Sequence, residues 1–274
     1  MSSILTNNSA MVALQTLKSI NGNLQKTQSE ISTGKSIASA KDNSAIWAIS
    51  KVMESDVSGF KAVSDSLSLG ESTVAVALAG AEQITDLLNQ MKEKVIAATG
   101  ENVDHAKLTN DVDEMKNQIT SIISASQFNG ANLLDTAGGD ITVLSSLDRD
   151  SGGTVTAANI TVASVDFEGG LDLTTIDIST ATAADGSIAA METLIQTAID
   201  GSAALGASSK RIGDQVEFVG KVMDAMKSGI GALVDADMEE ASARLQALQV
   251  QQQLGTQSLS IANQAPQAIL SLFR

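Results

Sequence analysis

The sequence predicts a mainly α-helical protein, in which the N- and C-terminal segments form a long antiparallel helical rod or coiled coil with a small β-hairpin-like insertion. The chain of 274 residues contains one proline and 2% aromatic residues, which favours uninterrupted helices with narrow aliphatic seams over a core of large rings. Apolar residues recur at sevenfold spacing toward both ends of the chain. The middle instead alternates Thr, Val and Ile between glycine pairs, as short strands do.

The N-terminal third contains two heptad stripes. The first comprises Ala10, Leu17, Leu24 and Ile31, and Gly34 ends it. The second, much longer stripe runs from residue 46 to residue 95, which is about 75 Å as one helix. Its members are Ile46, Met53, Phe60, Leu67, Val74, Ala81, Leu88 and Val95. Asp56 and Gly70 interrupt the neighbouring row, so this second seam is predicted to be imperfect.

Further helices are expected over residues 104–125, 188–233 and 238–274. The 188–233 stripe contains Leu205, Ile212, Val219 and Met226 at sevenfold spacing. In the last helix one row holds Leu248, Ala262 and Ile269, and the neighbouring row holds Leu245 and Leu259. Residues 1–29 and 241–274 each contain only two charged residues, which predicts surfaces that pack closely against copies or partners.

Residues 138–185 differ from the rest of the chain in pattern and in charge. Short strands are expected at 141–143, 155–156, 160–162 and 171–173, with turns at the glycine pairs 152–153 and 169–170. This segment holds eight acidic residues and one basic residue, Arg149, for a net charge of −7. We therefore expect an acidic β insertion that lies on the outside, in water.

The composition argues against several classes of function. A net charge of −15 disfavours nucleic acid as a partner, because phosphate binding needs a basic surface. The chain has no cysteine and one histidine, His105, so thiolate sites and multi-histidine metal sites are excluded. No apolar stretch approaches the ~20 residues that span a bilayer. We expect no enzyme activity, no catalytic, cofactor-binding or metal site, no cofactor and no membrane insertion.

Both ends of the chain resemble bacterial flagellin. The N-terminal motifs are Ile4–Asn7, Glu30–Lys35 and Ile37–Ala45. The C-terminal motifs are Asp235–Asp237, Gln252–Gly255, Ser258–Leu259, Ala262–Gln267 and Leu270–Arg274. Two motif blocks in the right order at opposite ends make this a specific resemblance, and it covers roughly residues 4–130 and 188–274.

The resemblance implies a short flagellin without large outer domains. Residues 1–44 and 235–274 would form an inner terminal coiled coil, residues 45–137 and 186–234 a helical rod, and residues 138–185 a variable, surface-exposed β insertion. The subunit would leave the cell through the flagellar type III apparatus and polymerise outside it into the swimming filament. The implied partners are further copies of itself, an export chaperone, the filament cap and the hook-junction proteins.

The resemblance also assigns roles to three groups of residues. The self-assembly seam would comprise Ala10, Leu17, Leu24, Ile31, Leu245, Leu248, Leu259, Ala262 and Ile269. The rod core would comprise Ile46, Met53, Phe60, Leu67, Val74, Leu88, Leu205, Ile212, Val219 and Met226. In many flagellins an innate immune receptor reads the helix that corresponds to residues 88–97. The family motif has Arg and Leu where this chain has Gln90 and Lys94, whereas Glu93 is kept, so we expect weak recognition.

Three alternatives compete with the flagellin interpretation. A hook–filament junction protein has similar end helices, although the motif Ala262–Gln267 favours flagellin. An enzyme carried within residues 138–185 is the second alternative, but a zinc peptidase needs paired histidines and this segment has no histidine. A generic intracellular coiled-coil scaffold would leave the motifs at both ends unexplained.

Overall fold

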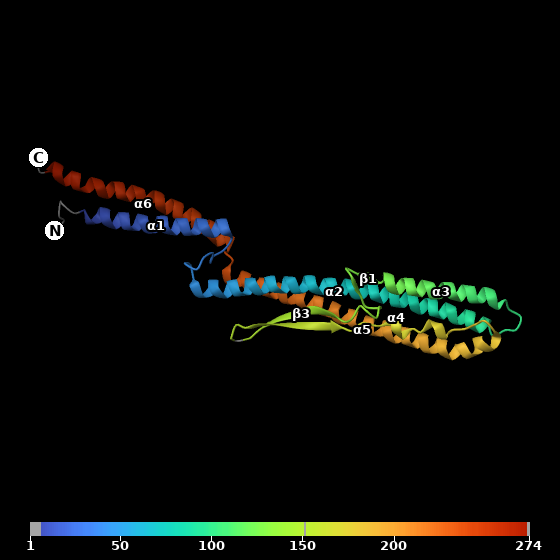
Figure 1. Cartoon of the computed structure of the whole chain (residues 1–274). Helices are drawn as coiled ribbons and strands as arrows, with labels where there is room; N and C mark the ends of the chain where they lie inside the picture. Colours follow the sequence, from blue (N-terminus) through green and yellow to red (C-terminus); the bar gives the residue numbers. More distant parts are fainter. Residues whose placement is uncertain (1–6, 151, 273–274) are drawn as a thin grey trace. The chain divides into compact units, whose positions relative to one another are not determined.

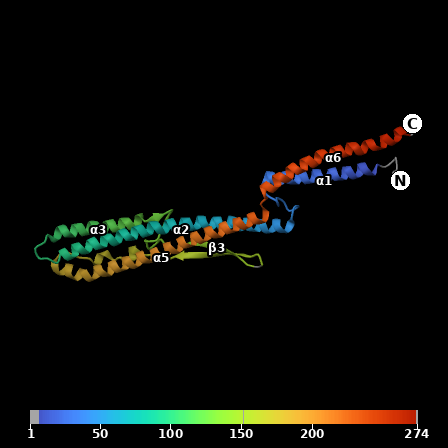
Figure 2. The same ribbon diagram turned by 180° about the vertical axis from the view of Figure 1, so that it is seen from behind.

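The computed structural model describes residues 7–150 and 152–272, and these residues are mainly helical (Figures 1 and 2). The elements, in chain order, are α1 (Asn8–Thr33), α2 (Ser44–Ala97), α3 (His105–Ala125), β1 (Gln127–Phe128), β2 (Ala131–Asn132), β3 (Ile141–Arg149), β4 (Val155–Val162), α4 (Phe167–Gly170), the 3₁₀ turn η1 (Leu173–Thr175), α5 (Ala181–Val234) and α6 (Met238–Leu272). The predicted fold class is confirmed. In the described part of the chain no helix is both long and apolar enough to cross a membrane.

The chain divides into two compact units. The terminal unit comprises Met1–Ser55 and Ala225–Arg274, and the rod unit comprises Asp56–Asp224. The long helices α2 and α5, of 54 residues each, contribute to both units.

In the terminal unit α1 and α6 lie side by side (Figures 1 and 2). The side chain of Asn7 caps the start of α1 by accepting a hydrogen bond from Ala10 N. Gly34 ends this helix in the left-handed conformation, with φ of 69°, and its N–H donates to Glu30 O. The heptad stripe therefore begins and ends close to the residues that the sequence indicated.

The connector between α1 and α2 pairs with the connector between α5 and α6. Ser36 N donates to Val234 O at 2.8 Å, and Ala236 N donates to Gly34 O at 3.0 Å. Lys35 and Asp235 face each other as an antiparallel bridge. We call these paired connectors the clasp. The clasp joins two points of the chain that lie about 200 residues apart in the sequence.

The rod unit is built on antiparallel stretches of α2 and α5 (Figures 1 and 2). Helix α3, which Asp104 caps at Lys107 N, lies along the later part of α2, and Lys94 of α2 pairs with Asp111 of α3. The β3–β4 hairpin lies along the earlier part of α2. The core consists of apolar, mostly aliphatic side chains from the three helices, and these are buried: Phe60, Leu67, Val74, Leu88, Val112, Ile119, Leu205, Ile212 and Val219.

The β3–β4 hairpin has one face packed against the rod. The strands are antiparallel, from Ile141 opposite Val162 to Arg149 opposite Val155, and the register shifts by one residue between Leu144 and Ser146. Val143 and Leu147 of β3 lie over Gly70 and Gly59 of α2. On the other side Gln215 of α5 donates from Nε2 to Ser145 O at 2.8 Å. The period-2 alternation thus gives this insertion a buried inner face, which the expectation of an insertion lying in water did not include.

Two local expectations were wrong. Residues 171–173 do not form a strand, because Asp166 caps α4 at Gly169 N and Asp172 caps η1 at Thr174 N. Helix α5 begins at Ala181 rather than at residue 188, because Thr180 caps it: Thr180 Oγ1 accepts from Ala183 N at 3.2 Å. In both places a short polar side chain organises the backbone of the next turn.

Candidate self-assembly surface

The predicted seam residues lie between α1 and α6 of the same chain. Of the described members Leu248 is buried, and the others are half-buried: Ala10, Leu17, Leu24, Ile31, Leu245, Leu259 and Ala262. The side chain of Ile269 lies outside the described residues. Gly255 permits a close approach of the two helices, since a Cβ atom placed on it would stand 3.1 Å from Leu17 Cδ1. The structure thus uses these stripes first to join the two ends of one chain.

Two hydrogen bonds fix the register of this antiparallel pair. Asn7 Nδ2 donates to Ala262 O at 2.7 Å near one end. Gln252 Nε2 donates to Asn21 Oδ1 at 2.7 Å further along. Both bonds join uncharged side chains or backbone, which is consistent with the scarcity of charge in these segments.

The outer faces of α1 and α6 carry large apolar side chains that no described residue covers. Met11, Val12 and Leu14 are exposed on α1, and Val250, Leu254 and Ile261 are exposed on α6. Reasoning from heptads missed these residues, because it assigned one apolar face to each helix. The available signal was the low charge of the ends, since α6 has no ionic side chain after Arg244.

A groove of about 450 Å³ lies beside these side chains in the terminal unit. Its walls come from α1 and α6, and the lining residues are Ala13, Thr16, Ile20, Gln251, Leu254, Gly255 and Ser258. Several of these residues are small, which leaves a gap between the two helices. None of the lining residues is charged, so the groove does not gather ionisable groups.

The predicted core residues behave differently in the two units. Phe60, Leu67, Val74, Leu88, Leu205, Ile212 and Val219, all in the rod unit, are buried. Ile46, Met53 and Met226 belong to the terminal unit and are half-buried. Met53 nonetheless faces α5, since its Cε lies 3.2 Å from where a Cβ on Gly229 would stand.

One carboxylate joins the clasp to the start of α2. Glu54 accepts from Lys51 Nζ at 2.6 Å and from Lys35 Nζ at 3.3 Å, and Lys35 belongs to the clasp. The hydrogen bond from Lys51, followed by that from Lys35, holds the pKa of Glu54 below its ordinary value. The carboxylate thereby stays ionised and bridges two lysines.

The predicted receptor segment lies near the end of α2. Gln90 and Glu93 are exposed, whereas Lys94 is half-buried and is paired with Asp111 at 3.0 Å. The aliphatic side chain of the family motif is therefore replaced here by a cation engaged with α3.

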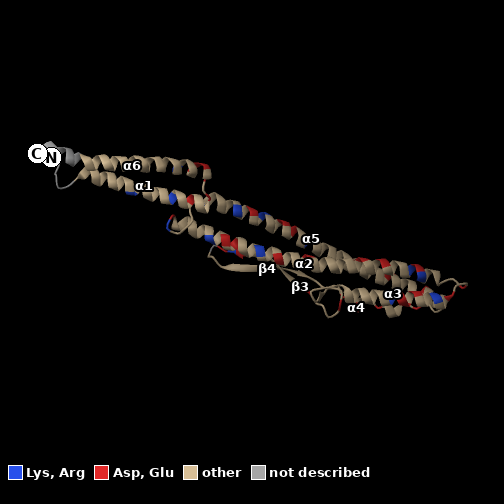
Figure 3. Ribbon diagram, turned by 90° about the horizontal axis from the view of Figure 1, so that it is seen from above, with Lys and Arg blue, Asp and Glu red and all other residues tan. Residues whose placement is uncertain are grey.

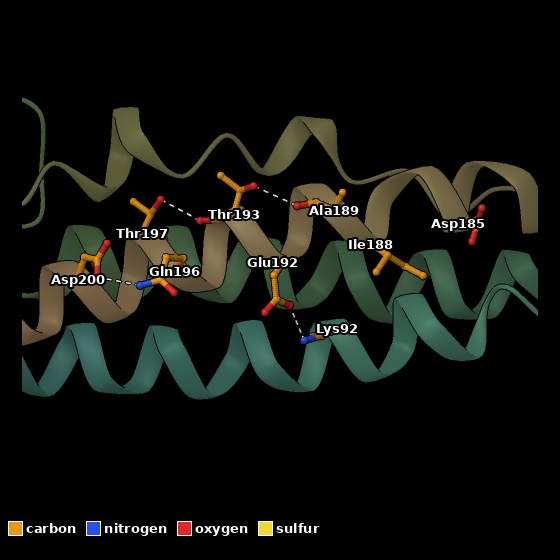
Figure 4. A pocket seen from close by; sticks show the side chains of 9 residues that line it. All are labelled: Lys92, Asp185, Ile188, Ala189, Glu192, Thr193, Gln196, Thr197 and Asp200. Atoms are coloured by element: carbon orange, nitrogen blue, oxygen red, sulfur yellow. Dashed lines mark hydrogen bonds and ion pairs between the residues drawn. The ribbon is translucent and has the colours of Figure 1, made fainter.

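No other feature of the described residues outlines a reactive site. His105 is half-buried at the start of α3, with Nδ1 3.1 Å from Ile178 O, so it secures the segment before α5. A groove of about 850 Å³ runs along α5 (Figure 4). Many of its polar groups already have partners: Glu192 pairs with Lys92 of α2, and Gln196 donates to Asp200. No three acidic or histidine side chains within the described part of the chain are grouped to hold a metal ion.

Charge is segregated between the two units. The rod unit contains 25 acidic and nine basic residues, for a net charge of −16, whereas the terminal unit contains seven and eight, for +1. In Figure 3 α1 and α6 are accordingly almost free of charged colours. Copies of this chain can therefore approach closely through the terminal unit with the least electrostatic repulsion.

Comparisons with known proteins agree with this arrangement. A family model described as the bacterial flagellin N-terminal helical region matches residues 4–138, and one for the C-terminal helical region matches residues 188–273. Flagellin FljM of Caulobacter vibrioides is 46% identical over 280 residues, covering 100% of this chain and 99% of that protein. A flagellin of Brucella melitensis is 40% identical over 282 residues, covering both chains fully.

A solved structure, Bacillus cereus flagellin, is 22% identical with a TM-score of 0.49, covers 55% of this chain and 86% of that chain, and adds nothing to the assignment. The two family models together span most of the chain. The Caulobacter and Brucella flagellins are 46% and 40% identical to it over its whole length. The exposed, charge-poor helix pair at the joined ends, the acidic rod and the matches to both terminal regions thus lead to one conclusion: this chain belongs to the bacterial flagellin family.

Proposed function

We propose that the terminal unit is the part of this flagellin through which copies polymerise. A flagellin is a structural subunit of the extracellular flagellar filament that drives swimming, and it is not an enzyme. The observation that carries the proposal is the α1–α6 pair, which is almost free of charge and has apolar side chains on its outer faces as well as in its seam. Burying those outer faces against copies removes apolar area from water, at ~25 cal/mol per Å².

The proposal includes the predicted position of each segment of the chain in the filament. Residues 1–44 and 235–274 line the inside of the filament, residues 45–137 and 186–234 surround them as the rod, and residues 138–185 face outward. The near-neutral terminal unit and the acidic rod unit support this order, because an acidic surface is best placed in water. The further partners that we propose for this chain are an export chaperone of the type III apparatus, the filament cap and the hook-junction proteins.

The junction-protein alternative gains no support, since the curated relatives described above are named flagellins. The discriminating experiment is electron microscopy of the purified protein after seeding with short filament fragments. Long uniform tubes are expected. Protein that only caps the seeds would favour the junction protein, and protein that neither elongates nor caps would reject filament formation.

Two variants test the role of the seam. Leu17→Asp and Leu248→Asp place a charge between α1 and α6, which costs several kcal/mol if it stays buried and unpaired. We expect helical content and thermal unfolding of the rod unit to persist, while amide protection in residues 8–33 and filament growth are lost. Normal filaments from either variant would contradict the role of these residues.

A further inference from the structure

The chain contains two Asn-Gly pairs, Asn21–Gly22 and Asn129–Gly130. In such a pair the backbone nitrogen of glycine can attack the side-chain amide carbon of asparagine and close a five-membered ring. Glycine favours this attack because it has no side chain to shield its nitrogen and because its backbone turns freely. The two pairs lie in different local structures, and this difference decides which of them can react in the folded chain.

The pair Asn129–Gly130 forms the turn of the β1–β2 hairpin. Phe128 pairs with Ala131, so the two residues between them make a two-residue loop. The φ angle is 50° at Asn129 and 85° at Gly130. Positive φ at both central positions is the type I′ geometry that Asn-Gly pairs favour. Both residues are exposed, so water and hydroxide reach the turn.

Both reacting groups of this turn are free to move. Within the described residues the side-chain amide of Asn129 has no hydrogen-bond partner, and the N–H of Gly130 donates no hydrogen bond. A Cβ atom placed on Gly130 would meet nothing within 4 Å, so the space around this residue is open. The amide of Asn129 can therefore rotate toward the nitrogen of Gly130 without breaking a contact.

The pair Asn21–Gly22 is held in place by α1. The N–H of Gly22 lies in the interior of this helix, where the helical hydrogen bonds use it. The side chain of Asn21 is also engaged, because its Oδ1 accepts from Gln252 Nε2 at 2.7 Å. Ring closure at this pair requires local opening of α1. The same dipeptide thus serves as an internal control with the same intrinsic chemistry.

We propose that Asn129 is a site of spontaneous deamidation in the folded chain, and that the product loosens the β1–β2 hairpin. The nitrogen of Gly130 gives its proton to a solvent base and bonds to Asn129 Cγ. The bond from Cγ to Nδ2 breaks, and the amide nitrogen leaves as ammonia. Water then opens the resulting succinimide at either carbonyl, which yields aspartate or isoaspartate. Either product adds a negative charge, and isoaspartate also lengthens the backbone by a methylene group.

The hairpin positions a segment that holds part of the rod core. Asn132 Nδ2 donates to Ile123 O at 2.7 Å, and Asn132 Oδ1 accepts from Leu134 N at 2.9 Å. Leu133 and Leu134 are fully buried, and Leu133 O accepts from Val165 N at 2.6 Å. A longer backbone at the turn disturbs the strand pairing that brings Asn132 to this place. Deamidation of one exposed turn therefore reaches buried contacts of the rod unit.

The first test compares the two pairs in the full chain. Purified protein is incubated in mildly alkaline buffer, with or without urea, and its peptides are followed by mass spectrometry. In native buffer we expect Asn129 to exchange its NH₂ for OH at least about tenfold faster than Asn21, because Asn21 reacts through local opening. In urea the two rates should converge. Equal rates in native buffer, or reaction at Asn129 in urea alone, would overturn the proposal.

The second test measures what the product does to the hairpin. Asn129→Gln is the matched control, because it keeps an amide whose attack would need a less favourable six-membered ring. Amide exchange at residues 123–134 should rise on incubation of wild type, and incubated Asn129→Gln should stay as fresh protein. Fresh Asn129→Asp adds the charge without the methylene group, and a smaller rise is expected. Deamidated wild type with unchanged exchange would refute the loosening, and an equal rise in Asn129→Asp would refute the role of the longer backbone.

Discussion

Val143 of the β3 strand occupies the space that a side chain at position 70 of α2 would need. A Cβ atom on Gly70 would stand 2.5 Å from Val143 Cγ2 and 3.0 Å from Cγ1, much closer than carbon atoms pack. The glycine that interrupts the apolar row of α2 is therefore the docking point of the hairpin. Buried Val143 restores to the core the apolar contact that Gly70 omits.

Replacing Gly70 should destabilise the rod unit. Gly70→Ala adds a methyl group where Val143 already packs, and we expect the free energy of unfolding to fall by about 1–3 kcal/mol despite the better helix propensity of Ala. Gly206→Ala is the control, because nothing lies within 4 Å of its added Cβ, and it should raise stability by about 0.5–1 kcal/mol. Chemical denaturation measures both changes.

The double variant Gly70→Ala with Val143→Ala shows whether the loss arises from this contact. If it does, the two losses are not additive, because the smaller side chain at position 143 makes room for the methyl group. Strictly additive losses would contradict direct packing of the two residues.

The ion pair between Asp56 and Arg149 should secure the tip of the hairpin. Arg149 Nε lies 3.1 and 3.2 Å from the two carboxylate oxygens of Asp56, and Arg149 Nη1 donates to Gly153 O in the turn. Asp56→Asn should increase amide exchange of residues 147–157, while exchange at residues 141–143 changes little. The exchanged pair Asp56→Arg with Arg149→Asp should restore protection in part, and no change in either variant would exclude this role.

Acid should loosen the junction of the clasp with α2. The pKa of Glu54 is lowered in the folded protein by the hydrogen bonds from Lys51 and Lys35, so its contribution to stability is present above its unfolded value of 4.5. That contribution is lost as the pH falls below this value through the folded pKa. Thermal unfolding between pH 3 and 6, followed through Trp47, should therefore depend less on pH in Glu54→Gln than in wild type.

We expect the innate immune receptor of flagellins to recognise this chain weakly, and we expect two substitutions to strengthen that recognition. Lys94 is engaged with Asp111 and Gln90 cannot donate a bidentate pair as Arg does. We expect Gln90→Arg with Lys94→Leu to signal more strongly than the wild-type chain in receptor-expressing cells, with Glu93→Ala as the negative control. Strong signalling by pure wild-type protein would contradict the prediction.

The helices were predictable because heptad spacing fixes which face is buried. Phe60, Leu67 and Val219 are buried as their spacing indicated. The hairpin's buried face was not predictable, since a strand of alternating residues has an inner face only if something lies beneath it. The clue was present at Asp56 and Gly70: both interruptions of the α2 row are positions where β3 or its turn attaches.

The described seam residues lie between α1 and α6 of one chain, and their role in self-assembly stays a prediction. A heptad stripe states that Leu17 and Leu248 are covered, and it does not say whether the same chain or a neighbour covers them. The exposed apolar side chains Leu254 and Ile261 of α6 were missed although they are seven residues apart, because the predicted seam was taken as the one apolar face of this helix.

The clasp closes the chain between residues 36 and 234 into a loop whose ends are joined by hydrogen bonds and by no covalent bond. Backbone hydrogen bonds at Ser36 and Ala236 join the start and the end of that loop. A single proteolytic cut in the turn between α2 and α3 would therefore yield two fragments that stay bound to each other through the clasp, α1–α6 and the rod helices. A filament of such subunits would keep both fragments of a cut subunit in place. Shorter polypeptides on a denaturing gel would then not show that the filament had come apart.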